Sequence, residues 1–255
     1  MLRNTSTFYK YIILLCLLFS QLCLAAPEDN RDNHALVIID MQPYFATRAG
    51  NDQKDKNKIK VLKIINKQIA AIREAKKAKI PIVLIEYEYG SSCCGKTNRK
   101  LRNEVKFYKK FKTIKKNTDG MFSSSNKYKQ KLTDYLEDNH IGSLIILGAN
   151  GGACVKQSIK GSLEENYNVI AYNKGIADFN YRDFIYPYKD IYKFKPNCKN
   201  CNFKEVDSLA TVSLVLATSA ENKVKNKVNI DSDTKEKKEP LPLKENEEYN
   251  SGSVK

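Results

Sequence analysis

The chain has 255 residues, enough for one large domain or two small ones, and 42% of them are hydrophobic, so it can bury a core. Eleven glycines and seven prolines exclude collagen-like and low-complexity architectures. The two histidines lie far apart in the chain, which argues against a metal site built from several histidines.

The first 26 residues are predicted to be a secretory signal peptide. Two basic residues precede an apolar run over residues 11–19, and small residues end the segment at positions 25–26. The run is short for a bilayer span, which favours cleavage over an uncleaved anchor. Neither Cys16 nor Cys23 follows the small residues of a lipoprotein signal, so lipidation is the weaker alternative. We therefore expect an exported protein, periplasmic or secreted, with no stable membrane association after cleavage.

Loss of this segment leaves five cysteines, Cys93, Cys94, Cys154, Cys198 and Cys201. Four of them form two close pairs, one adjacent and one of C-x-x-C spacing, and Cys154 stands apart. Because export leads to an oxidising compartment, we expect one or two disulfides to join the two pairs. A four-cysteine zinc site is the rival, although adjacent cysteines make awkward ligands.

The middle of the chain alternates between apolar runs and amphipathic segments. The runs predict strands at 35–39, 80–85, 111–114, 143–147 and 168–172, and the amphipathic segments predict helices at 55–79, 126–138 and 153–165. This alternation predicts an α/β fold, a mostly parallel sheet with helices on both faces in three layers. Residues 179–204 give no clear pattern, and residues 205–218 suit either a helix or a last strand.

A single domain over residues 27–220 is expected, followed by a disordered charged tail over residues 221–255. The tail holds eight lysines and eight acidic residues, so its charges cancel, and the net charge of +15 belongs to the rest of the chain. Lysines that solvate helix faces explain this surplus most simply. No nucleic-acid-binding motif is present, so we expect no specific nucleic-acid partner.

Three polar residues follow predicted strands. Asp40 ends the first strand, Lys116 lies just past the short third strand, and Cys154 follows the fourth at the start of a helix. Each has an ordinary structural explanation: a turn or cap aspartate, one of many surface lysines, a small core cysteine. The carboxyl ends of parallel strands share one edge of the sheet, so the three can meet there. A helix start is also expected to lower the pKa of the Cys154 thiol.

The order Asp, Lys, Cys resembles the isochorismatase-like cysteine hydrolases, the superfamily of nicotinamidase and N-carbamoylsarcosine amidase. The resemblance covers roughly residues 33–180. The stretches that carry it are Ala35-Leu-Val-Ile-Ile-Asp40-Met-Gln-Pro-Tyr-Phe45, Lys116 with Phe122 six residues on, and Leu147-Gly-Ala-Asn-Gly-Gly-Ala-Cys154-Val155. Lys115 competes with Lys116, and the spacing to Phe122 favours Lys116.

The resemblance implies a role for each member of this set. Cys154 would be the nucleophile, Asp40 the general base and then acid, and Lys116 the electrostatic partner. A non-proline cis peptide would join Ala149 to Asn150 and turn the Asn150 N–H toward an oxyanion, although the family more often has threonine at this position.

A substrate pocket is expected beside Asp40. Gln42, Tyr44 and Phe45 would wall it, with packing under the loop as the alternative for the two aromatic residues.

Nicotinamidases of this family bind a divalent metal through an Asp/His cluster, but residues 41–139 contain no histidine. We therefore expect neither a metal nor another cofactor. The favoured function is a metal-independent cysteine hydrolase that cleaves an amide-like C–N bond of a small molecule. The alternatives are a catalytically silent secreted binding or host-interaction protein and an isochorismatase-type vinyl-ether hydrolase. Whether the chain forms a homo-oligomer is left open.

Overall fold

The computed structural model describes residues 33–46, 56–88, 94–177 and 201–218. Its centre is a six-stranded sheet in the order β3-β2-β1-β4-β5-β6, in which every neighbouring pair is parallel. The strands are β1 (Asn33–Ile39), β2 (Ile82–Tyr87), β3 (Phe111–Lys116), β4 (Ile141–Ala149), β5 (Asn168–Ala177) and β6 (Phe203–Val206). The predicted parallel α/β fold is thus confirmed.

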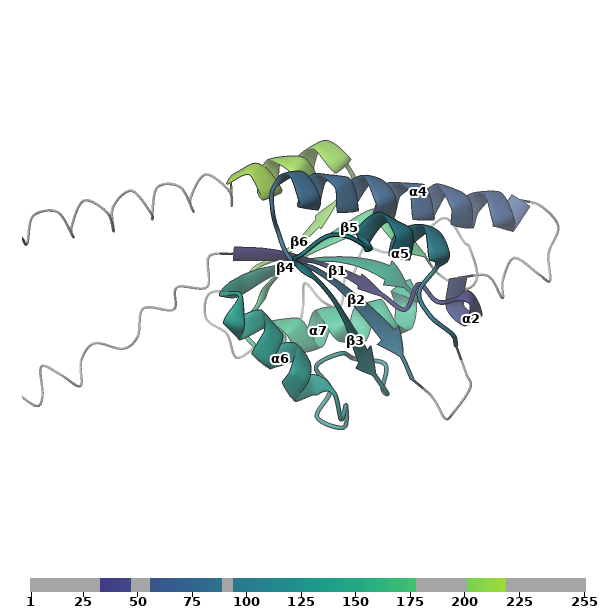
Figure 1. The fold of residues 1–255 in the computed structure, drawn as a ribbon. Coiled ribbons are helices and arrows are strands. Elements are labelled where there is room, and N and C mark those ends of the chain that lie inside the picture. Colours follow the sequence, from purple (N-terminus) through teal and green to yellow (C-terminus); the bar gives the residue numbers. More distant parts are fainter. Residues whose placement is uncertain (1–32, 47–55, 89–93, 178–200, 219–255) are drawn as a thin grey trace, which may run out of the picture.

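Helices cover both faces of the sheet (Figure 1). On one face α4 (Lys56–Lys77), α5 (Arg99–Val105) and a helix over residues 209–218 pack against one side of the strands. On the other face lie α6 (Lys129–Asp138) and α7 (Lys156–Glu164). The short α2 (Pro43–Ala46) follows β1. None of the helices in the described ranges has both the length and the apolar character needed to cross a bilayer.

The apolar runs of the sequence become the central strands because both faces of a parallel sheet are covered. Residues 35–39 of β1 and 144–149 of β4 are all buried. The strand order reverses between these two strands, since β2 and β3 continue on one side and β5 and β6 on the other. In such sheets a crevice opens at the carboxyl ends of the two strands that flank the reversal.

Gly148 lets the two central strands approach closely at that end. Its φ is +133°, and a Cβ atom there would lie 2.2 Å from the carbonyl oxygen of Ile39. Only glycine fits this position, because any side chain would collide with the backbone of β1. The segment that follows β4 is thereby held against the end of β1.

The structure corrects several predicted boundaries. The third strand extends to Lys116, so this residue is part of the strand instead of following it. Residues 203–218 contain both of the alternatives, first β6 and then a helix. The helix α5 was not predicted, because its seven residues include only two buried apolar side chains. The predicted signal peptide and charged tail lie outside the described residues and stay predictions.

Candidate active site

The structure brings Asp40, Lys116 and Cys154 together at the carboxyl edge of the sheet. Asp40 follows β1, and its N–H donates to the carbonyl oxygen of Ile85 in β2 at 2.9 Å. Its φ of +50° turns the chain sharply there. The side chains of Asp40 and Lys116 are fully buried, and Cys154 is 5% exposed. The cluster is therefore almost entirely shielded from bulk water.

Lys116 reaches this cluster from the edge strand β3, across the end of β2. Its register partner in β2 is Tyr87, and the Lys116 ammonium lies 4.5 Å from the centre of the Tyr87 ring. Beyond the ring, Nζ lies 2.7 Å from Oδ2 of Asp40. Nζ also donates to the carbonyl oxygens of Thr118 and Asp119 at 2.9 and 3.1 Å. Three oxygens and one ring thus surround the ammonium and fix its position.

The Asp40 carboxylate is poised to exchange a proton near neutral pH. Burial raises the pKa of Asp40 from 3.8 to about 6, against the opposing effects of Lys116 and of a hydrogen bond with the Cys154 thiol. Apart from Lys116 and Cys154, no described residue donates a hydrogen bond to either carboxylate oxygen of Asp40. A carboxylate with so few competing donors can accept and return a proton.

Cys154 lies in a π-helical turn, η1 (Gly151–Val155), between β4 and α7. The N–H groups of Ala153 and Val155 both donate to the carbonyl oxygen of Asn150, which closes the turn. The Cys154 Sγ lies 3.7 Å from Oδ1 of Asp119. The turn therefore presents the sulfur to both Asp40 and Asp119.

The expected low pKa of the Cys154 thiol is wrong. Burial, followed by the Asp40 charge, raises its pKa from 9.0 to about 12, and Lys116 offsets this only in part. A helix start favours a thiolate, but here the sulfur is buried between carboxylates. The thiol is consequently protonated at rest and needs a base at the moment of reaction.

The segment before the nucleophile contains a cis peptide between Ala149 and Asn150. Ala149 ends β4, and Asn150 precedes the π-helical turn with extended backbone angles. Both residues therefore lie between the end of β4 and Cys154. Their predicted part in an oxyanion hole stays a prediction.

The three predicted pocket residues have different surroundings. Gln42 is buried, and within the described residues its amide bonds to backbone atoms: Nε2 donates to Tyr87 O and Gly95 O, and Oε1 accepts from Tyr87 N. Gln42 therefore braces the loop after β2. Phe45 packs edge-on against the rings of Tyr44 and Tyr87, and Tyr44 is 42% exposed.

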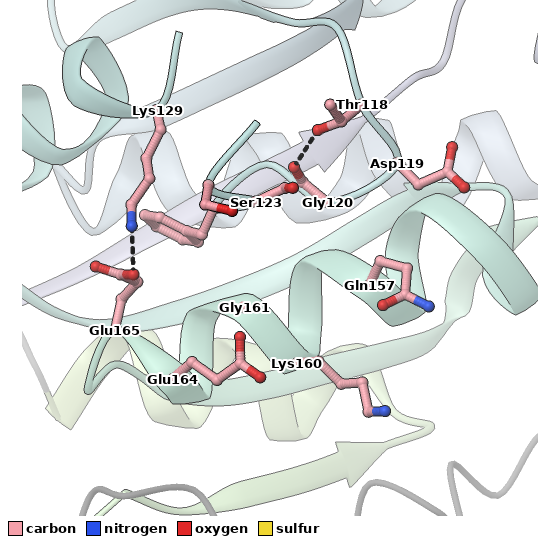
Figure 2. A pocket seen from close by; sticks show the side chains of 12 residues that line it. Thr118, Asp119, Gly120, Ser123, Lys129, Gln157, Lys160, Gly161, Glu164 and Glu165 are labelled. Carbon is pink, nitrogen blue, oxygen red and sulfur yellow. Dashed lines mark hydrogen bonds and ion pairs between the residues drawn. The ribbon is translucent and has the colours of Figure 1, made fainter. Parts of the chain in front are cut away.

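Asp119 is the residue beside the sulfur that sequence reasoning missed. It lies in the loop after Lys116 and lines a pocket of about 530 Å³ between that loop and α7. Figure 2 shows Asp119 and Gln157 at one end of the pocket and the ion pair of Lys129 with Glu165 at the other. The only signal in the sequence is its place three residues after Lys116.

The other described cysteines differ from Cys154, which is free. Cys94 and Cys201 are disulfide-bonded. Cys94 adjoins Gly95 at the carboxyl edge, and Cys201 precedes β6 at the amino edge, so these two cannot bond to each other. Cys93 and Cys198 lie outside the described residues, and the pairing stays a prediction.

The residues present do not fit the metal centre of the nicotinamidases. No histidine occurs between residues 41 and 139. Within the described ranges, no group of three or more histidine, cysteine or acidic residues is arranged to hold a metal ion.

Several solved structures share the fold at low sequence identity. The nicotinamidase/pyrazinamidase of Bacillus subtilis is 14% identical (TM-score 0.51), with 68% of this chain and all of that chain covered. An isochorismatase-like hydrolase of Alkaliphilus metalliredigens is 16% identical (TM-score 0.52), with 73% and 98% covered. A Caenorhabditis elegans ribonuclease, MAR1, is 20% identical (TM-score 0.52), with 73% and 82% covered. These similarities establish the fold, and the three proteins are named for different activities.

The family itself is shown by sequence. No curated protein matches the chain. The model of the isochorismatase domain, however, matches residues 34–184, more than half of the chain, and this stretch includes Asp40, Lys116 and Cys154. The chain therefore belongs to the isochorismatase family of hydrolases.

Proposed function

We propose that this protein is an exported cysteine hydrolase that cleaves the C–N bond of a small amide through a covalent thioester, without a metal. The observation that carries the proposal is the burial of a carboxylate, an ammonium and a thiol in one cluster at the crevice of the sheet. A protonated thiol beside a base is the arrangement that nucleophilic catalysis requires.

In the first step the thiol proton of Cys154 passes to Asp40 as Sγ attacks the carbonyl carbon. Proton transfer and attack belong to one step because a thiol with a pKa of about 12 is almost entirely protonated at neutral pH. Lys116 keeps Asp40 ionised before the attack, since an adjacent ammonium favours a carboxylate. The developing oxyanion would be met by the backbone N–H groups of Asn150 and Cys154.

In the second step the C–N bond breaks, and Asp40 returns the proton to the departing nitrogen. The product leaves as ammonia or an amine, and the acyl group remains on Sγ as a thioester. Water then gives a proton to Asp40 and attacks the thioester carbon. The C–S bond breaks, Asp40 returns the proton to sulfur, and a carboxylic acid is released.

The test is a screen for ammonia release over small primary amides, with a Cys154→Ala chain as the blank. Hydrolysis of at least one amide above the blank is expected. Brief incubation followed by acid quenching should also show the mass of one acyl group on the peptide that contains Cys154. Turnover that continues unchanged in the blank would refute the proposal.

The rate should depend on pH through Asp40. The base must be ionised to accept the thiol proton, and burial raises the pKa of Asp40 to about 6. We expect kcat/KM to be constant at neutral pH and to fall about tenfold for each pH unit below about 6. Circular dichroism over the same range separates this loss from unfolding. An inflection near pH 4, where an unperturbed carboxyl titrates, would contradict the assignment of Asp40.

Export rests on the signal peptide predicted for residues 1–26, which lie outside the described part of the chain. Expression of the full chain in a bacterial host, fractionation and amino-terminal sequencing should give an exported protein that begins near residue 27. A chain retained in the cytoplasm with its first residue intact would refute export and leave the hydrolase proposal untouched.

A further inference from the structure

Asp119 occupies a position that the proposed catalytic steps do not use. Its Oδ1 accepts from the Cys154 Sγ at 3.7 Å, yet the residue is exposed and lines the pocket beside α7. One carboxylate thus contacts the nucleophile and also lines the pocket in which Figure 2 shows it.

The loop that carries Asp119 is fixed in place. The Lys116 ammonium binds the carbonyl oxygen of Asp119 at 3.1 Å, and the N–H of Met121 donates to Oγ of Ser158 in α7 at 3.2 Å. The backbone on both sides of Asp119 is therefore held in place, with its carboxylate beside the Cys154 sulfur. A preorganised charge discriminates between ligands better than one on a free side chain.

Asp119 contributes a negative charge to one end of the pocket. Asp40 is neutralised by Lys116 at 2.7 Å, whereas no ion pair of Asp119 is found among the described residues. Of the two lysines that line the pocket, Lys129 is paired with Glu165 at 2.6 Å, and Lys160 lies nearer to Gln157 (Figure 2). At the Asp119 carboxylate itself a cation would be attracted and an anion repelled.

The negative charge of Asp119 disfavours ionisation of the Cys154 thiol, and a cationic substrate would offset this effect. Its charge is one of the groups that raise the pKa of both Asp40 and Cys154. A positive group bound to Asp119 would cancel this field at the moment when negative charge develops on sulfur. Binding of such a substrate and activation of the thiol would then support each other.

The distances define where the positive group should lie. A carbonyl carbon in position for attack lies about 3–3.5 Å from Sγ. An ammonium lies about 2.8 Å from the carboxylate oxygen that binds it. An amine on the carbon next to the carbonyl is about 2.5 Å from the carbonyl carbon. Sγ and Oδ1 lie 3.7 Å apart. With the lengths above, one substrate can therefore place its carbonyl carbon at Sγ and its amine at Oδ1 at the same time.

We propose that Asp119 determines specificity by binding the protonated amine of a substrate that carries this amine next to the scissile carbonyl, and by repelling anionic substrates. The substrate class rests on the proposed amide hydrolysis. The charge selection does not, because the Asp119 carboxylate lies 3.7 Å from the Cys154 sulfur and its charge acts on any reagent that reaches this sulfur.

Alkylation of Cys154 tests charge selection without turnover. In each reaction sulfur forms a bond to carbon, the halide leaves, and the thiol proton passes to Asp40 or solvent. The probes are 2-bromoethylammonium (cationic), iodoacetamide (neutral) and iodoacetate (anionic), with each rate divided by that for free cysteine and the adduct located by peptide mass. The Asp119→Asn chain should shift the cation-to-anion ratio toward the anion by about tenfold to a hundredfold.

The matched control is Asp138→Asn, which removes the same charge at the far end of α6. This variant should leave the ratio within about twofold of the wild type, because exposed charges separated by more than about 10 Å are screened by salt. An Asp119→Asn ratio equal to that of the control would overturn the proposal, whether or not any amide is hydrolysed.

Hydrolysis of a matched trio of amides tests the substrate class. Glycinamide, propionamide and malonamate have similar size and differ in charge. The wild type should favour glycinamide over propionamide by about tenfold or more and reject malonamate, and Asp119→Asn should remove the preference. Equal rates on glycinamide and propionamide in both chains would refute the substrate class and leave amide hydrolysis standing. A shifted alkylation ratio with no amide hydrolysed would refute amide hydrolysis and the substrate class, and would leave charge selection at Asp119 standing.

Discussion

A Cys154→Ser chain is expected to remain folded and to lose about 10⁴-fold or more in kcat/KM. Serine preserves the shape of a side chain that is 5% exposed. Its hydroxyl, however, is a much weaker acid than a thiol, so a carboxylate of pKa about 6 cannot activate it. Ammonia release from the best amide of the screen gives the rate, and urea unfolding tests the fold.

The Cys154→Ala chain provides the comparison for this loss. Both variants should be equally inactive, since the proposed chemistry requires sulfur and not merely an oxygen nucleophile. A serine variant within tenfold of the wild type would show that residue 154 does not form the covalent intermediate.

Replacement of Lys116 by methionine should lower the free energy of unfolding by about 3–5 kcal/mol at pH 8 and abolish hydrolysis. The side chains of Lys116 and Asp40 are fully buried, so loss of the ammonium leaves a carboxylate without its counter-ion. The penalty should shrink as pH falls. Burial already raises the folded-state pKa of Asp40 above its unfolded value, and protonation below that pKa removes the buried charge. Urea unfolding at pH 8 and pH 5 measures both effects.

The double variant Asp40→Asn/Lys116→Met is the control for this prediction. It removes both charges together and should recover most of the lost stability at pH 8 while remaining inactive. A Lys116→Met chain as stable as the wild type at pH 8 would show that the ion pair does not hold the cluster together.

Sequence reasoning located the cluster because strand ends in a parallel sheet converge. Asp40 and Cys154 each follow a run of buried apolar residues, and such runs can be recognised from residue types alone. Lys116 is harder to identify from the sequence, because one lysine among 44 basic residues carries little signal. Its burial depends on Tyr87 and on the loop carbonyls, which come together only in the fold.

The pKa of Cys154 could not be predicted from position along the chain. A helix start is a local feature and favours ionisation, whereas the two nearby carboxylates come from segments 114 and 35 residues away. Asp119 was overlooked for the same reason, since nothing in its immediate neighbours indicates contact with a distant thiol. Charges distant in the chain therefore raise the pKa of Cys154, whereas the local helix start alone predicts a lower pKa.

Because Lys116 is enclosed, the lysines on the basic surface can be modified chemically while Lys116 stays unmodified. Acylating reagents modify amines that they can reach, and this ammonium is sealed beneath an aromatic ring and two peptide carbonyls. Mild acetylation can therefore neutralise the outer lysines while sparing the one in the interior, so that the effect of the surface charge can be measured apart from turnover.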